Sequence, residues 1–189
     1  MGKGIYRRRV SVVVLHQGKV LAFGAEDPTT HRKYVFVPGG RIEPGETVEQ
    51  AAVRETLEET GFHVSCLSEP TIERSYDFEW DGQLNICQTI FVAAELLSDR
   101  AEVVHDAPYH RGVEWIPVAE LSKVFGYHND ILEPVVFLTQ FLMQKNNHAW
   151  TAPGSGGMPE PSRRGPQAPS APRRPSQPSG QPATAPRRT

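Results

Sequence analysis

The sequence has 189 residues, 38% of them hydrophobic and 22% charged, which suits one domain of ordinary size with an extension. Six of the 20 basic and one of the 22 acidic residues lie in residues 151–189, which leaves 14 basic and 21 acidic residues in residues 1–150. Because a segment this acidic repels polyanions, the composition excludes general electrostatic binding of nucleic acid, and a phosphate ligand would need a local cation.

The cysteines and the apolar runs indicate the compartment. Cys66 and Cys87 are the only cysteines and match neither a disulfide framework nor a zinc motif, so we expect a reducing, cytoplasmic location. The first apolar run, residues 10–15, is too short for a signal peptide or a membrane span. We therefore expect a soluble protein without a membrane partner.

The hydrophobic pattern predicts strands and helices in a mixed order. Residues 9–15 are β-branched and apolar, as in a buried strand, and residues 80–82 form a hairpin-turn sequence. Pro134 falls in the first turn of the last helix, where proline is tolerated. The expected strands are residues 9–15, 19–23, 34–38, 63–77, 84–96 and 112–116, the expected helical segments are residues 47–60, 118–124 and 130–145, and polar loops are expected at 24–33 and 97–111.

The end of the chain has a different composition. Residues 151–189 contain 10 of the 17 prolines and no lysine, and they lack the apolar content that offsets the entropy of ordering. We expect a folded domain at residues 1–147 and a disordered, Pro/Arg-rich tail at residues 148–189. The Pro-Arg-Arg repeats of this tail are compatible with an acidic or SH3-like partner, but a plain solvated tail is favoured and the tail partner is unknown.

The first predicted helix has clear start and stop signals. Thr47 and Gln50 have the spacing of a capping box, and Gly61 lies where a helix C-terminus favours glycine. At about 100° per residue, Val53 and Leu57 share one face, through which we expect the helix to pack.

Three carboxylates lie on the opposite face of this helix. Glu55, Glu58 and Glu59 repel one another, and their position near the negative end of the helix dipole is also unfavourable. A divalent cation removes this cost, and ligands that are all oxygen suit Mg²⁺ or Mn²⁺ better than zinc. We therefore predict a metal site here.

The residues that precede the helix and Arg54 within it complete the predicted site. Gly39 and Gly40 allow the backbone to approach the helix, so that a glycine carbonyl reaches the metal. Glu46 and Arg54 have opposite charges, so Arg54 either pairs with Glu46 or holds one of the glutamates in place.

The pattern of fixed residues from position 40 to position 62 resembles the Nudix box, G-x5-E-x7-R-E-U-x-E-E-x-G-U, in which U is bulky and apolar. Thr56 departs from it at a U position. The layout of residues 5–145 is also similar to the Nudix α/β/α sandwich with a mixed sheet. The matching positions are Gly40, Glu46, Arg54, Glu55, Glu58, Glu59, Gly61 and Phe62.

The resemblance implies a hydrolase that cleaves a nucleoside diphosphate linked to another group. It implies that Arg54 orients a glutamate, and that the general base is either a glutamate of the box or an acid in a later loop. The implied metal ligands are Glu55, Glu58 and Glu59 with the carbonyl of Gly39 or Gly40, and the candidate loop bases are Glu102 and Asp106, with Glu114 a weaker one.

Basic residues outside the box have two interpretations. Arg32, Lys33 and Arg41 flank the entrance to the box, and phosphate contact and plain surface charge are equally favoured for each. Of the three arginines at residues 7–9, we expect at least two on the surface.

Aromatic and histidine residues are also open to two interpretations. Tyr76, Phe78 and Trp80 alternate along a strand and would suit a stacked nucleobase, although a packed sheet face is slightly favoured. His105 and His110 are expected at the loop surface.

The substrate has several alternatives. A first strand close to the N-terminus argues for a compact enzyme that acts on nucleoside triphosphates or similar nucleotides. Dinucleoside-polyphosphate and nucleoside-diphosphate-sugar hydrolysis are alternatives, and a nucleotide-sensing module with a partner for the tail is less favoured because the acidic residues are complete.

Overall fold

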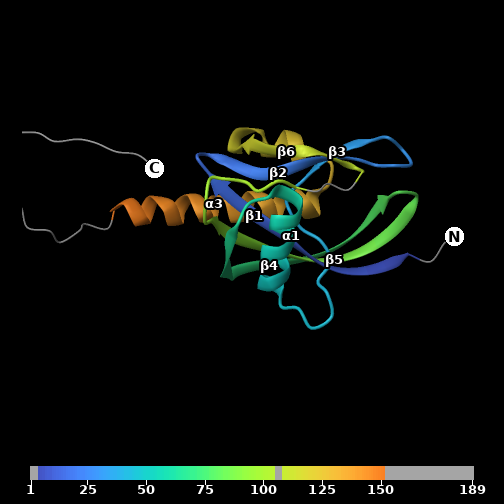
Figure 1. Ribbon diagram of the computed structural model, residues 1–189, viewed down its shortest axis with the longest axis horizontal. Coiled ribbons are helices and arrows are strands. Elements are labelled where there is room, and N and C mark those ends of the chain that lie inside the picture. The colour runs from blue at the N-terminus through green and yellow to red at the C-terminus, as the bar shows by residue number, and fades with distance from the viewer. Residues whose placement is uncertain (1–3, 105–107, 152–189) are drawn as a thin grey trace, which may run out of the picture. The chain divides into compact units, whose positions relative to one another are not determined.

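The computed structural model describes residues 4–104 and 108–151 (Figure 1). Each predicted strand and helix is present, most of them longer than expected. The elements are β1 (Ile5–His16), β2 (Lys19–Glu26), β3 (Lys33–Phe36), α1 (Val48–Thr60), β4 (Val64–Trp80), β5 (Gln83–Leu96), β6 (His110–Pro117), the 3-10 helix η1 (Val118–Glu120), α2 (Leu121–Phe125) and α3 (Asn129–Thr151).

The last helix extends past its predicted end. α3 continues to Thr151, into the first four residues of the predicted tail, whereas residues 152–189 lie outside the described residues. The predicted domain boundary at residue 147 stays a prediction. None of the helices in the described ranges has both the length and the hydropathy that crossing a membrane requires.

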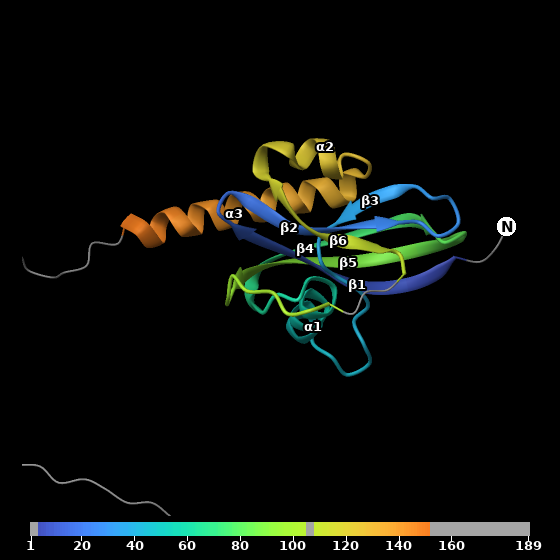
Figure 2. The same ribbon diagram turned by 45° about the horizontal axis from the view of Figure 1, so that its top comes forward.

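The sheet is mixed and is covered by helices on both faces. The strand order is β3-β2-β1-β5-β4, with β6 paired to β2. β1 and β5 are parallel, and the other strand pairs are antiparallel. Figure 2 shows α1 on one side of the sheet and α2 with α3 on the other. The predicted α/β/α sandwich is therefore confirmed.

β1 changes its neighbour along its length. Only its last two residues are in register with β2. Nearer the N-terminus, residues 38–42 take the same edge: the Val12 N–H donates to the Pro38 carbonyl over 2.7 Å, and the Val10 N–H donates to the Gly40 carbonyl over 2.9 Å. β2 and β3 therefore part from β1 and β5 at this end, and the cavity described below lies between them.

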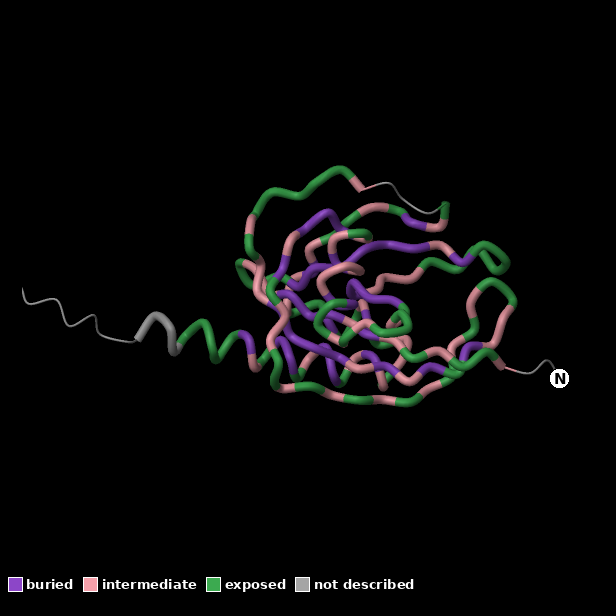
Figure 3. Tube along the Cα trace, turned by 60° about the horizontal axis from the view of Figure 1, so that its bottom comes forward, coloured by how far each residue is buried: buried purple, intermediate pink, exposed green. Residues whose placement is uncertain are grey.

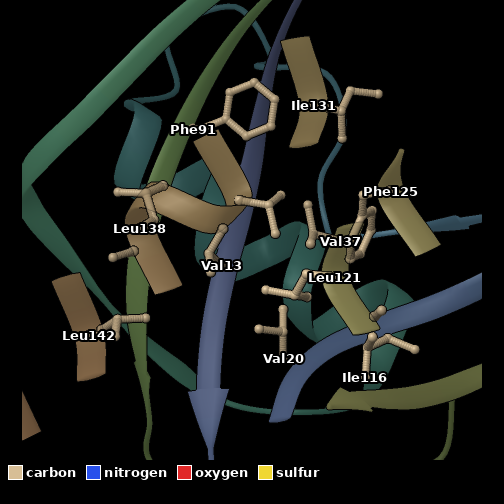
Figure 4. Close-up of a cluster of buried hydrophobic side chains, with 13 residues drawn as sticks. Val13, Val20, Val37, Phe91, Ile116, Leu121, Phe125, Ile131, Leu138 and Leu142 are labelled. Atoms are coloured by element: carbon tan, nitrogen blue, oxygen red, sulfur yellow. The ribbon is translucent and has the colours of Figure 1, made fainter. Parts of the chain in front are cut away.

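Alternate residues of β1 supply two hydrophobic cores. Val13 belongs to the core beneath α2 and α3, together with Phe91 and Leu138 (Figure 4). Val10 and Val12 point to the other face and belong to the core beneath α1. Buried segments therefore gather at the centre of the domain, while loops and strand ends are exposed (Figure 3).

α1 begins and ends as predicted, but its most buried residues are not the expected Val53 and Leu57. Thr47 and Gln50 form the capping box. The buried residues of the helix are Ala51, Ala52, Thr56 and Thr60. Val53 packs against the core beneath α1 but is only partly buried, and Leu57 is also only partly buried. The expected packing is therefore confirmed in part at Val53, but small residues that the pattern did not single out form the most buried face. Small side chains let the helix lie close to the sheet. The buried Thr56 hydroxyl has a hydrogen-bond partner, because it donates to the Ala52 carbonyl.

Asp27 fastens the two halves of the sheet at their open end. It is 2% exposed, and its carboxylate accepts hydrogen bonds from the N–H groups of Thr29 (3.0 Å), Thr30 (2.7 Å) and Asp81 (2.8 Å). The Thr29 hydroxyl also donates to the Asp81 carboxylate over 2.9 Å. The β2–β3 loop is thereby held to the β4–β5 turn, where Asp81 and Gly82 have positive φ angles.

Replacing Asp27 by alanine is expected to lower the melting temperature by about 5 °C, because buried N–H donors lose their partner. Asp27→Asn keeps one acceptor oxygen, so its melting temperature should lie between those of the wild type and Asp27→Ala. Thermal unfolding followed by circular dichroism measures the shift. Asp99→Ala, an exposed loop acid, is the matched control; an equal effect in both variants would refute the fastening role.

Candidate functional site

The predicted metal site forms where α1 meets the backbone at Gly39 and Gly40. The Gly39 N–H donates to a Glu59 carboxylate oxygen over 2.7 Å. A Cβ at Gly40 would lie 2.2 Å from the carboxyl group of Glu55, and one at Gly39 would lie 2.2 Å from the Val10 carbonyl oxygen. Both positions therefore require glycine for the helix and the strand to approach so closely.

Arg54 connects the acids of this site. Its guanidinium forms a bidentate pair with Glu46, with both distances 2.9 Å. The same group contacts Glu55 over 2.8 Å and Glu58 over 3.1 Å, and it donates to the Arg41 carbonyl over 3.0 Å. Both predicted roles of Arg54 are therefore present at once, since it pairs with Glu46 and also holds a glutamate.

The local environment shifts the pKa values of these acids in different directions. Hydrogen bonds from Arg54 lower the pKa of Glu46 to about 2, so it is a permanent anion. Burial raises the pKa of Glu59 to about 8, and the hydrogen bond from Gly39 only partly opposes this. Burial also raises the pKa of Glu55, against the influence of Arg54. The carboxyl groups of Glu55 and Glu59 thus lie close together and are removed from water, and the nearby positive charge does not fully offset the cost of ionising both.

These residues suit a divalent cation by their chemistry. Carboxylate oxygens and a backbone carbonyl are the ligands that Mg²⁺ and Mn²⁺ prefer. In residues 4–104 and 108–151, no three His, Cys, Asp or Glu side chains converge as a preformed metal site. The reason lies in the pairing described above, because Arg54 holds Glu55 and Glu58 while Glu59 bonds to the backbone. A bound cation would compete with Arg54 for these oxygens.

A cavity of about 380 Å³ opens beside the acids. Gly39 and Glu59 line it at one end, where Arg9 donates to the Gly39 carbonyl over 3.2 Å. Arg7 lines it as well, whereas Arg8 is exposed. The expectation that at least two of these three arginines lie on the surface was therefore wrong. Alternation along β1 places Arg7 and Arg9 on the same face.

Aromatic side chains form another part of the cavity wall. Tyr76, Phe78 and Trp80 alternate along β4 and all line the cavity, opposite Phe36 from β3. They also pack as a sheet face, since the Phe36 ring centroid is 5.8 Å from that of Phe78 and 5.7 Å from that of Trp80. Tyr76 accepts a hydrogen bond from Thr89 over 3.2 Å. Both interpretations of this strand are consequently compatible with the structure.

The flanking basic residues lie away from this cavity. Arg32, Lys33 and Arg41 are exposed, and none of them is part of its wall. The Arg32 guanidinium lies 5.1 Å from the centre of the Tyr34 ring. Their proposed contact with phosphate stays a prediction.

The candidate general bases occupy different places. Glu102 bonds to His63 over 2.6 Å, and its backbone packs against Gly61 at the end of α1. Its side chain does not line the cavity. Glu114 is exposed on β6, and Asp106 lies outside the described residues. The identity of the base therefore stays a prediction.

His110 is buried, contrary to the expectation of a loop surface. It lies at the start of β6, where its imidazole Nε2 is 2.8 Å from the Glu59 carbonyl oxygen and its ring stacks on Phe23 at 4.8 Å. The sequence contains no local sign of this role, which depends on the pairing of β6 with β2. His105 lies outside the described residues.

Comparison with known proteins identifies the family. The sequence model of the NUDIX domain matches residues 5–138. The chain belongs to the Nudix family. It is 35% identical over 101 residues to the putative mutator protein MutT4 of Mycobacterium tuberculosis (strain CDC 1551 / Oshkosh), a match that covers 50% of this chain and 37% of that protein. The match therefore spans well under half of the length of that relative.

Two further comparisons agree with this assignment. The chain is 62% identical over 29 residues to the putative 8-oxo-dGTP diphosphatase of Bacillus subtilis (strain 168), covering 15% of this chain and 20% of that protein. The Ap4A hydrolase of C. elegans shares the Nudix fold with a TM-score of 0.55 and 19% identity, over 74% of this chain and 98% of that chain. This likeness concerns the fold alone.

Glu46→Gln is expected to raise the Mg²⁺ concentration needed for half-maximal turnover about tenfold, as outer-shell changes commonly do. Without its main anchor, Arg54 remains on Glu55 and Glu58 and competes with the metal. Titration with Mg²⁺, and Mn²⁺ binding by calorimetry, measure the effect. Glu49→Gln removes an exposed acid from the same helix and is the control; an unchanged metal dependence in Glu46→Gln would refute this role of the pair.

The stability of the metal-free protein is expected to depend on pH through Glu59. With a pKa of about 8 in the folded state and about 4.5 when unfolded, the folded protein binds a proton that the unfolded chain has released. The free energy of unfolding therefore falls as the pH rises from 4.5 to 8 and then levels off. In EDTA, Glu59→Gln should flatten this fall in melting temperature, whereas Glu58→Gln, at an exposed position, should not. Parallel curves for wild type and Glu59→Gln would contradict the prediction.

Proposed function

We propose that this chain is a Mg²⁺-dependent Nudix hydrolase that cleaves a phosphate anhydride bond in a nucleoside di- or triphosphate derivative. One observation carries the proposal: Glu59 of α1 lines the end of a cavity whose walls provide arginines and aromatic rings. Acids that hold a metal ion are suited to cleaving the anhydride. The arginines are suited to binding its phosphates, and the aromatic rings are suited to stacking on a nucleobase. Mn²⁺ is an alternative metal.

The roles of the residues follow from their positions. Glu55, Glu58 and Glu59, with the Gly39 or Gly40 carbonyl, would hold the cation. When bound, Mg²⁺ neutralises phosphate charge and lowers the pKa of a bound water. Arg54 keeps the glutamates oriented through its pair with Glu46, and Arg9 binds phosphate oxygen beside Glu59. The protein thus acts mainly by positioning and electrostatics, as is usual for phosphoryl transfer.

The name of one relative favours a nucleoside triphosphate over the alternatives. This relative is named a putative 8-oxo-dGTP diphosphatase, and this name refers to a nucleoside triphosphate. Dinucleoside polyphosphates and nucleoside-diphosphate sugars remain the other substrates to test. A nucleotide-sensing module is disfavoured, because binding alone does not require the complete set of acids. We place the enzyme in the cytoplasm on the basis of its cysteine content.

Wild-type protein is expected to release phosphate or pyrophosphate from members of a nucleotide panel with Mg²⁺ and not with EDTA. Glu59→Gln should lower turnover about a hundredfold or more, because an oxygen ligand is lost without a change in the core. Product analysis by chromatography and mass spectrometry identifies the bond that is cut. Absence of metal-dependent turnover across the panel would refute the proposed function, and near-normal turnover in Glu59→Gln would refute the assigned metal site.

A further inference from the structure

The two arginines that line the cavity lie at different distances from the acids. Arg9 contacts the Gly39 carbonyl and lowers the pKa of Glu59, so it belongs to the acidic end. Arg7 lies two residues earlier on the same face of β1, which corresponds to about 7 Å along an extended strand. Their contacts also differ, because Arg9 bonds to the Gly39 carbonyl whereas Arg7 bonds to Asn85. The two arginines therefore occupy different parts of the cavity wall.

Arg7 is held in a fixed orientation by Asn85. The Arg7 Nε–H donates to the Asn85 side-chain oxygen over 2.6 Å. Asn85 is only 6% exposed, and its amide nitrogen donates to the carbonyls of Phe78 (3.2 Å) and Gln83 (3.0 Å). These two bonds determine which end of the amide faces Arg7. The guanidinium therefore keeps its terminal NH₂ groups in a set direction before any ligand binds.

The charge of Arg7 has no carboxylate partner in the described part of the chain. No Asp or Glu oxygen among these residues lies within 4.0 Å of the guanidinium groups of Arg7 or Arg9. A partly buried guanidinium with unused donors favours a ligand with acceptor atoms. Arg9 lies at the acidic end of the cavity, whereas Arg7 is linked through Asn85 to the backbone of Phe78 and so lies beside the aromatic part of the wall.

The surroundings of Arg7 fit the edge of a planar base. Phe78 and Trp80 project from β4 into the same cavity, and Phe36 lies opposite. Aromatic rings provide faces for a base, and a guanidinium in the plane of that base can read its edge. Guanine offers adjacent acceptors at O6 and N7, which match the fork of an arginine, whereas adenine places an NH₂ donor at position 6.

We propose that Arg7, oriented by Asn85, makes this enzyme selective for 6-oxopurine nucleotides such as GTP and dGTP. The inference rests on the proposed function and concerns the same cavity. Arg7 donates to O6 and N7 of the base, while Arg9 binds the phosphates. 8-Oxo-dGTP carries a hydrogen on N7 and so loses one of the two bonds to Arg7; dGTP is therefore the better substrate of the two.

The test is the ratio of kcat/KM for dGTP to that for dATP, measured with Mg²⁺ in the full chain. Wild type is expected to prefer dGTP by about tenfold or more, as one bidentate contact provides, with 8-oxo-dGTP below dGTP. Arg7→Met should bring the ratio close to one. Arg7→Lys keeps the charge but loses the fork, and it should also lose the preference. Arg8→Met, which removes the same charge from the exposed face of β1, should retain the wild-type ratio.

The possible results separate this inference from the proposed function. Turnover of all nucleotides with no preference for dGTP, or a wild-type ratio retained in Arg7→Lys, would overturn the role of Arg7 but leave the hydrolase intact. An equal loss for dGTP and dATP in Arg7→Met, with unfolding curves like those of wild type, would assign Arg7 to phosphate binding and overturn the inference. A wild type that turns over no nucleotide refutes the proposed function instead.

Discussion

Residues 38–42 hydrogen-bond to β1 along one edge, and α1 packs against the glycines of this segment. This short stretch of backbone is therefore fixed between a strand and a helix. The fit has no spare room, because a Cβ at Gly40 would collide with Glu55. The same segment displaces β2 from β1, which separates the halves of the sheet and makes space for the cavity. One backbone arrangement therefore creates both the acidic site and the space beside it.

The acids at this contact are electrostatically costly, and the protein offsets the cost only in part. Glu55 and Glu59 are on the packed side of the helix, where burial raises the pKa of both. Arg54 compensates Glu55, but Glu46 claims its strongest hydrogen bonds. A core built for stability alone would contain apolar residues here. A divalent cation would supply the positive charge that Glu55 and Glu59 still lack. The electrostatic cost is therefore concentrated at the site where the chemistry is proposed.

Local sequence signals predicted the elements well because caps, turns and periodicity act over a few residues. They failed where the answer depends on distant partners. The helical wheel favoured Val53, although the small side chains of Ala52 and Thr56 allow a closer approach to β1. Arg7 and Arg9 could not be placed from the strand alone, since their face becomes a cavity wall only because β2 leaves β1. His110 depended in the same way on the stacking with Phe23.

The two ends of the cavity are controlled by different parts of the fold. The acidic end depends on residues 38–42 and α1, whose spacing is fixed by the Nudix box. The far end is built from β1, β3, β4 and β5, and Asp27 holds its two halves together. Arg7 and Asn85 on those strands belong neither to the caps and glycine contact nor to the core beneath α1, so they can change without disturbing the helix. Family membership therefore identifies the kind of bond that is cut, whereas the choice of nucleotide has to be found in strand residues such as Arg7 and Asn85.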